Sequence, residues 1–457
     1  MRTLIHQCAW EAKLAFRRSS TWVILGLLLG AGIVSIVLSG QRSQARTEEF
    51  RRLEGQFSEQ IAKLSKRYAN GENAGYWGYY TAFPVASPAA PLAALSQGVE
   101  ANAPSVNWVR LLGIEPQLYE GGIHNPLLQT LGGLDPGFVM IVLAPLALLL
   151  MGHDVLSRDR SLGVHPLVMS HVRNRHALIW IRLLVRSALV FAITALIHLL
   201  AVFMLRLPLD LACAKWLLTA WLGLLPWVAI TAVLAVRLKS PQATLSGALG
   251  MWVTLVWILP CSINLLVSSV TDAPEGMELT IRQRQVMHDG WDQDRKANYR
   301  LFLERHPEWR HLGDVPAEFS WRWYYAMHEV ADQAVSGLAK SYVDRLQSRS
   351  DLARRLSWFV PTCYTQLLLA NQSGTDLDSH LRHLAGVRRF HEELKGYFFP
   401  RIFHDRQLHP SDTDGFPRHR ATPEPPSDLP SPLPLLLAAA LPLVFYPYRK
   451  FPHDPTA

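Results

Sequence analysis

Long apolar blocks alternate with strongly polar stretches along this chain. A bilayer core about 30 Å thick is crossed by a helix of about 20 apolar residues, since lipid offers no partners for backbone groups. Residues 22–39 contain no charge and no proline, and the block exceeds the about 7–15 apolar residues of a secretory signal, so it predicts an uncleaved anchor. The further predicted spans are residues 136–151, 176–205, 211–236, 244–270 and the shorter, proline-interrupted 433–446.

Basic residues in the short connections predict the orientation of these six spans, because cytoplasmic loops carry an excess of lysine and arginine. Basic residues cluster before the first span, between the second and third, between the fourth and fifth, and after the sixth, whereas Arg206 stands alone between the third and fourth. Both termini are therefore expected in the cytoplasm. The predicted organisation is a cytoplasmic N-terminal segment (1–20), a transmembrane helix (21–39), a periplasmic segment (40–135), four transmembrane helices (136–270) with a cytoplasmic loop (152–176), a periplasmic domain with a proline-rich linker (271–432), a last transmembrane helix (433–447) and a tail (448–457).

The two long polar segments are expected to be mainly helical. In residues 41–69 the apolar positions recur every three or four residues, which predicts a helix that continues from the first span and projects from the membrane. Residues 71–80, rich in glycine and aromatic residues, are interpreted as a loop whose rings pack locally or rest on the membrane surface. Residues 271–432 show helical periodicity that ends in an extended linker from residue 412. The predicted fold class is all-α: a polytopic membrane protein with six transmembrane helices and a mainly helical periplasmic region.

Composition narrows the functional classes. Of the 457 residues 49% are hydrophobic and only 18% charged, against about 25% charged in soluble domains. The net charge of +8 arises largely from the cytoplasmic connections, so it is a topology signal, and no nucleic-acid partner is expected. Of the four cysteines only Cys363 lies in a predicted periplasmic segment, which excludes an intrachain disulfide there.

Motifs for enzymatic chemistry are absent from the sequence. It contains no GxxxxGK[ST] phosphate-binding loop, no GxSxG, no HExxH and no CxxC. We therefore expect no catalytic residue, no cofactor and no metal, and any energy for movement must come from another molecule. The histidines of the cytoplasmic loop match no metal-ligand spacing and are interpreted as part of a basic surface; they are His153, His165, His171 and His176.

Polar residues elsewhere receive structural interpretations. His391 is expected on a solvated helical face together with Glu392 and Glu393, with a weak metal site as the alternative. His198, in the middle of the third span, predicts a hydrogen bond between helices, with a proton relay as the alternative. Arg182 and Arg186 lie near the cytoplasmic end of that span, where their side chains could extend to the membrane surface.

The cytoplasmic connection LSRDRSLGVHPLVMSHVRNRHALIW (156–180) resembles the loop between the second and third spans of type 2 ABC exporter permeases. In that family a stretch of acidic residues and arginine precedes a glycine, an apolar turn and a basic return into the membrane. Residues 1–20 resemble the family's interfacial helix. One departure is that Arg160 and Ser161 stand where a further acidic residue is more common.

The periplasmic sequence resembles the subgroup of this family with a large periplasmic domain of unknown function before the last transmembrane helix. The resemblance extends over nearly the whole chain. The stretches that carry it here are WRWYYAMHEVAD (321–332), LARRLSWFVPT (352–362) and GTDLDSHLRHLAGVRRFHEELKGYFFPRIF (374–403).

The resemblance implies a permease subunit of the bacterial inner membrane without its own ATPase site. Its functional residues would be mechanical contacts rather than catalysts, and it would move in response to a separate ATP-binding cassette subunit. That subunit would dock on residues 154–176 and on the N-terminal helix, and two permease copies or paralogues would form the export pathway among membrane lipids. The residues expected to couple the subunits are Asp154, Arg158, Asp159 and Gly163. Reversing the charges of Arg158 and Asp159 together is expected to uncouple ATPase stimulation without affecting membrane insertion.

Two other classes of function stay open from the sequence. A membrane-anchored scaffold or sensor would use the outer helices to bind a periplasmic partner, and would not need the patterned cytoplasmic loop. An enzyme acting on lipid or cell-wall precursors would need convergent catalytic residues, of which the sequence offers no set. The substrate, the choice between homodimer and heterodimer, and the choice between transport and force transmission are likewise open.

Overall fold

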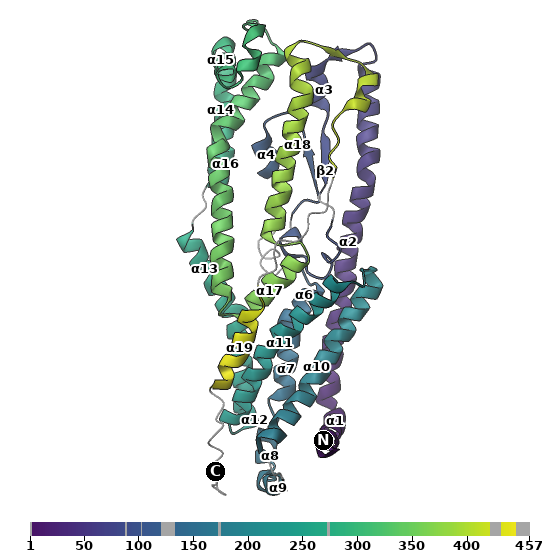
Figure 1. Cartoon of the computed structure of the whole chain (residues 1–457), viewed down its shortest axis with the longest axis vertical. Helices are drawn as coiled ribbons and strands as arrows, with labels where there is room; N and C mark the ends of the chain where they lie inside the picture. Colours follow the sequence, from purple (N-terminus) through teal and green to yellow (C-terminus); the bar gives the residue numbers. More distant parts are fainter. Residues whose placement is uncertain are drawn as a thin grey trace.

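The computed structural model describes residues 2–86, 89–101, 103–119, 133–171, 175–271, 275–420 and 431–444. The molecule is elongated, with the apolar helices gathered at one end and a second helical region, here called the distal region, at the other (Figure 1). Helices dominate, and the described strands form two short antiparallel pairs. The predicted all-α class is therefore confirmed.

Helix α2 (Ser19–Arg67) runs without interruption from the apolar end into the distal region (Figure 1). Its first half is apolar, and its second half carries charges of both signs with a buried stripe that includes Leu53, Phe57 and Leu64. Leu53 and Phe57 lie one helical turn apart, and Leu64 follows two turns later, so all three face the core of the distal region. The helix predicted to continue from the first span is thus present.

Among the described residues, five helical segments are long and apolar enough to cross a membrane, and this indicates a membrane protein. They are Ser19–Arg67, Pro136–Ser161, His176–Leu205, Leu211–Arg237 and Pro241–Val270. The sixth predicted span corresponds in part to α19 (Leu433–Val444), a shorter apolar helix of 12 residues; residues 445–447 lie outside the described part of the chain. The elements of this end are α1 (Arg2–Phe16), α6 (Pro136–Phe138), η2 (Val139–Leu143), α7 (Ala144–Gly152), α8 (Ser157–Ser161), α9 (His165–His171), α10 (Arg175–Leu205), α11 (Leu211–Arg237), α12 (Pro241–Val253), η3 (Thr254–Ile258) and α13 (Leu259–Val270).

Two of these spans contain a π-helical turn, and each turn lies directly before a proline. The turn η2 precedes Pro145, and η3 precedes Pro260. A proline inside a helix has no N–H to donate and its ring clashes with the carbonyl four residues earlier, which a locally widened turn relieves. Both spans therefore continue through their prolines.

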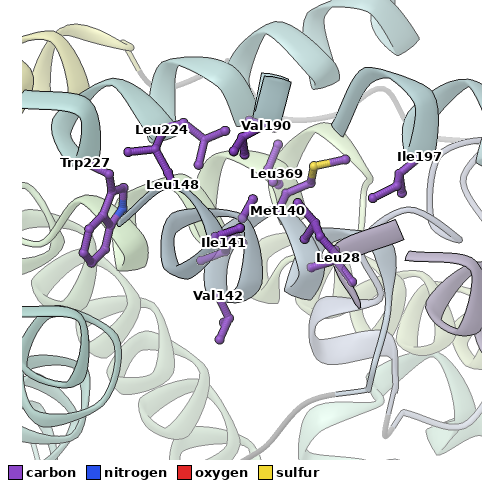
Figure 2. Packing of buried hydrophobic residues seen from close by; sticks show 14 of the residues in the cluster. Leu28, Met140, Ile141, Val142, Leu148, Val190, Ile197, Leu224, Trp227 and Leu369 are labelled. Atoms are coloured by element: carbon purple, nitrogen blue, oxygen red, sulfur yellow. The ribbon is translucent and has the colours of Figure 1, made fainter. Parts of the chain in front are cut away.

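The spans pack around a core to which η2 contributes Met140, Ile141 and Val142 (Figure 2). Val190 of α10 and Leu224 of α11 belong to the same cluster (Figure 2). The same cluster includes Leu369 of α17 (Pro361–Gln372), a helix that lies in the chain between two helices of the distal region. The membrane-type core and the distal region are thus joined by packing.

The distal region consists mainly of helices that pack around a core rich in aromatic side chains. Its elements are β1 (Glu72–Asn73), α3 (Ala74–Tyr80), β2 (Phe83–Ala86), η1 (Gly98–Ala101), β3 (Val106–Val109), α4 (Ile114–Tyr119), α14 (Glu275–Asp292), α15 (Arg295–Arg305), η4 (Pro307–Leu312), α16 (Trp321–Ser357), α18 (Leu377–Phe403), β4 (Gln407–Leu408) and η5 (Pro410–Gly415). Strand β1 pairs with β4 and β2 with β3, both antiparallel. The largest fully buried side chains include Trp77, Phe83, Phe302, Trp323 and Phe398.

The prediction of a loop over residues 71–80 is wrong, because residues 74–80 form α3. The Asn73 side chain caps this helix by accepting a hydrogen bond from the Gly75 N–H at 2.8 Å. Trp77 is fully buried and its indole N–H donates to the Leu408 carbonyl at 3.2 Å. The aromatic side chains of this segment therefore pack locally, as expected, but from a helix.

Candidate functional site

The segment predicted to couple the protein to an ATPase lies at the far end of the apolar helices, beside α1 and α12 (Figure 1). Helix α7 ends at Gly152, a turn follows, and α8 and α9 then lead back to α10. We call this segment, residues 152–171, the α8–α9 segment. Residues 172–174, which complete the predicted loop, lie outside the described part of the chain.

Asp154 pairs with arginines from two other parts of the chain. Its carboxylate lies 2.7 Å from the Arg18 guanidinium, which directly precedes α2, and 2.5 Å from that of Arg186 in α10. Arg158 is a more distant third partner at 3.8 Å. Arg186 also donates to the Met151 carbonyl at 2.8 Å. Asp154 thus joins the start of α2, the α7–α8 turn and α10.

Asp159 belongs to a second group of ion pairs centred on Arg182 of α10. The Arg182 guanidinium lies 2.5 Å from Asp159 and 2.9 Å from Glu11 of α1, and it donates to the Val155 carbonyl at 3.0 Å. Charge-assisted hydrogen bonds of this kind fix orientation more firmly than neutral ones. The α8–α9 segment is consequently tied to both α1 and α10.

The prediction that Arg182 and Arg186 extend to the membrane surface is wrong. Their side chains are only 11% and 8% exposed and are engaged by carboxylates. The reason is that Glu11 and Asp154 come from distant parts of the chain and meet these arginines only after folding. Both arginines therefore belong to the site, as do Glu11 and Arg18.

The other two predicted residues lie on the surface of the segment. The Arg158 side chain is 48% exposed, and its contact with Asp154 is long. Gly163 adopts a left-handed conformation with φ of 71° just after α8. The Gly163 N–H donates to the Arg160 carbonyl at 3.1 Å and the Val164 N–H to the Asp159 carbonyl at 3.0 Å, which closes the end of the helix.

Replacing Gly163 with alanine is expected to loosen this turn. The left-handed conformation costs a residue with a β-carbon about 1 kcal/mol, and no atom lies within 4 Å of the position the new carbon would take, so the cost is conformational. Amide hydrogen exchange in α8 and α9 should become about fivefold faster. Gly250→Ala, in the helical interior of α12 and also without neighbours within 4 Å, is the control and should not accelerate it. Equal protection in the Gly163 variant would contradict this role.

The α8–α9 segment has one buried and one exposed apolar face. Val155, Leu156 and Met169 pack into a small cluster with residues of α10. Leu162 and Leu167 instead point outward, with 64% and 62% exposure. The Arg160 guanidinium donates to the Leu238 carbonyl at 3.2 Å and so adds a link to the connection before α12. The α8–α9 segment, referred to below also as the platform, is therefore anchored on one face and exposes apolar side chains on the other.

The histidines of the apolar end make contacts within the protein. Within the described residues, no group of three or more histidine, cysteine, aspartate or glutamate side chains could hold a metal ion. His153 contacts the Leu150 carbonyl at 2.7 Å. In the third span, the predicted contact between helices is present: His198 lies 3.3 Å from the Cys213 sulfur of α11 and stacks on Trp216.

A second group of charges, in the distal region, is buried. Glu329 of α16 lies 2.7 Å from the Lys395 ammonium of α18. Burial raises the pKa of Glu329, but hydrogen bonding with His306 and the charge of Lys395 outweigh it and lower that pKa to about 2. Asp332, one turn further along α16, accepts the Ile114 N–H at 2.6 Å, yet burial raises its pKa to about 7.

His391 belongs to the same buried region, so its predicted place on a solvated helical face is wrong. It is fully buried, and burial lowers its pKa to about 3, which keeps it neutral. Its neighbour Glu392 does face solvent. Sequence reasoning missed Glu329 and Asp332 as well; the available signal was their spacing, which places both on the same side of α16 as the buried Val335.

Comparison with protein families gives one match. Residues 277–422, about a third of the chain, match a family described as a domain of unknown function (DUF3526). The match extends from α14 past η5 and so lies between the fifth candidate span and α19, where the resemblance places a domain of unknown function. Neither the curated proteins nor the solved structures gave a match.

Proposed function

We propose that this chain is the membrane-spanning permease subunit of an ABC transporter, acting in export and driven by a separate ATP-binding subunit in the cytoplasm. The α8–α9 segment is the receiving surface for that subunit. A second copy or a paralogue of the permease completes the pathway through the bacterial inner membrane. The chain supplies no ATPase site of its own.

The observation that carries the proposal is the anchoring of the α8–α9 segment. Asp154 and Asp159 connect it through Arg18, Arg182 and Arg186 to the first helices and to α10. A push on this segment would reach at least three helices at once, because ion pairs and a buried cluster leave it little independent freedom. A scaffold bound only through the distal region would not require such a connection.

The proposed topology has six spans, with α19 as the sixth and the α8–α9 segment in the cytoplasm. Helix α19 packs beside α11, and its Leu435 is buried against Tyr364 and Leu368 of α17. The Tyr364 hydroxyl donates to the Ser431 carbonyl at 2.7 Å, which fixes where the chain turns back towards the apolar end. In this topology α1, the α8–α9 segment and the far end of α19 share the cytoplasmic side (Figure 1).

Exposed leucines of the platform provide the test. Affinity purification of the full chain from its native membranes should co-purify an ATPase subunit that carries a GxxxxGK[ST] motif. The double variant Leu162→Asp/Leu167→Asp should reduce its recovery at least about tenfold, because two carboxylates would have to be desolvated in the interface. Both side chains are exposed, so the variant should reach the membrane at normal levels.

Leu301→Asp is the matched control, since Leu301 is an exposed leucine of α15 in the distal region. It should leave recovery of the ATPase unchanged. The proposal fails if no ATPase co-purifies, or if the double variant retains it like the control. Labelling of a cysteine placed at position 167 by a membrane-impermeant reagent added outside intact cells would also contradict it.

A further inference from the structure

The distal region contains a wide cleft of about 950 Å³, and no residue of the α8–α9 segment lines it. Helix α2, strand β3 and helices α4, α14 and α16 contribute to its walls. A volume of this size accommodates an extended segment of several residues rather than an ion or a water cluster. The cleft is therefore a candidate binding site separate from the apolar end of the molecule.

Strand β3 presents an unpaired edge in this cleft. It forms a two-stranded sheet with β2, and no further strand of the described chain joins it. Trp108 lies opposite Pro84 in the register. Because proline has no N–H, this pair cannot exchange two hydrogen bonds, and the backbone N–H and C=O of Trp108 point to the other edge. An extended peptide could bind there by adding a strand.

The charge of the cleft is one-sided. Arg110 and Arg284 line it with exposed side chains, and none of the described residues that line it is an aspartate or a glutamate. Leu112 and Met287 add apolar surface next to the arginines. A ligand with acidic groups and apolar groups in alternation complements this lining, whereas a basic ligand does not.

Gln283 supplies a largely buried amide group to the wall of the cleft. Its side chain is only 5% exposed and lines the cleft. Its amide nitrogen lies 2.9 Å from where a β-carbon of Gly113 would be, so only glycine at that position admits it. The amide N–H groups of a glutamine can donate to a carbonyl or carboxylate oxygen of a ligand in the cleft.

We propose that this cleft binds an extended acidic peptide segment of another protein. The peptide would lie along the free edge of β3, with its carboxylates at Arg110 and Arg284 and a carbonyl at Gln283. Apolar side chains, a free strand edge and an amide favour a peptide over an anionic polysaccharide, which would use neither the edge nor Met287. This binding goes beyond the proposed transport function and does not depend on the ATPase.

The test uses the full-length chain, purified in detergent and immobilised, with an equimolar pool of random eight-residue peptides as the probe. The bound fraction should be enriched in glutamate and aspartate relative to the unbound fraction. In Arg110→Glu/Arg284→Glu this enrichment should vanish, and in Gln283→Leu the total bound peptide should fall about tenfold. Arg282→Glu, which changes an exposed arginine of α14 outside the cleft, should bind like the wild type.

Several results would overturn the inference. They are the absence of acidic enrichment, enrichment that persists in the double arginine variant, and equal loss in Arg282→Glu. Displacement of the bound peptides by an anionic polysaccharide that itself binds with the same dependence on Arg110, Arg284 and Gln283 would assign the cleft to a sugar instead. Because the changed arginines are exposed, a folding defect does not confuse these outcomes.

Discussion

Asp154→Ala should lower the stability of the apolar end by about 3–5 kcal/mol, because it leaves two guanidinium groups without their carboxylate. Arg186 is nearly buried, so its charge cannot be solvated in place, and Arg18 loses its short contact. The amount of protein in the membrane and its apparent melting temperature in detergent should both fall strongly. Hydrogen exchange in the α8–α9 segment should increase at the same time.

A control variant and a rescue variant distinguish the loss of these ion pairs from a general loss of stability on mutation. Arg158→Gln removes a half-exposed partner at 3.8 Å and should change stability by no more than about 0.5 kcal/mol. Asp154→Leu combined with Arg186→Met replaces the buried pair by apolar side chains and should recover much of the loss. If Asp154→Ala proves as mild as Arg158→Gln, the ion pairs described for this site do not hold it together.

This arrangement also changes the design of a coupling experiment. Asp159 is paired with Arg182 inside the molecule, so reversing its charge would disturb folding as well as docking. Arg158 alone is the better surface probe of the predicted pair. The combined reversal of Arg158 and Asp159 should therefore be read against Arg158→Glu by itself.

Lys395→Met should have a comparable effect in the distal region, again about 3–5 kcal/mol at neutral pH. The substitution leaves the buried Glu329 carboxylate without the ammonium at 2.7 Å. Hydrogen exchange of the α16 and α18 amides in the full chain measures the loss. Glu329→Gln/Lys395→Met should restore most of the protection, because the neutral amide can still pair with Gln333.

The pH dependence gives this second prediction a signature. In the wild type the pKa of Glu329 is lowered, so its stabilisation is present above about pH 4.5 and is lost as the pH falls towards 2. Without Lys395, one of the interactions that lower this pKa is lost, so Glu329 is protonated at a higher pH than in the wild type. Protonation removes the unpaired buried charge, so the variant should regain stability as the medium becomes acidic. The deficit relative to the wild type should be largest near pH 7 and shrink below pH 5. A deficit independent of pH would contradict the electrostatic origin.

The sequence alone was sufficient for features set by local periodicity. The apolar runs located the five candidate spans. The three-to-four-residue spacing of Phe57, Ile61 and Leu64 predicted the long extension of α2. It was not sufficient for α3, because glycines and aromatic residues disguise a short helix that Asn73 caps and tertiary packing stabilises. Local propensity decides little in such a segment.

The candidate site was predictable only in part, for the same physical reason. Asp154 and Asp159 stood out as acids in a basic loop, but the Arg18 partner of Asp154 is 136 residues away in the chain. Arg182, which pairs with Asp159, also pairs with Glu11 at a separation of 171 residues. A usable signal was the pair Arg182 and Arg186, one helical turn apart within an apolar span. Two such charges at adjacent turns call for carboxylate partners more often than for solvent.

The continuity of α2 has a mechanical consequence. Its 49 residues correspond to a rod about 74 Å long, at 1.5 Å per residue. Arg18 at the base of the rod forms an ion pair with Asp154. Gln56 and Gln60, near its tip, line the cleft of the distal region. Tilting such a lever by about 5° at its base would sweep its tip through about 6 Å, enough to widen or close the cleft from the opposite end of the molecule.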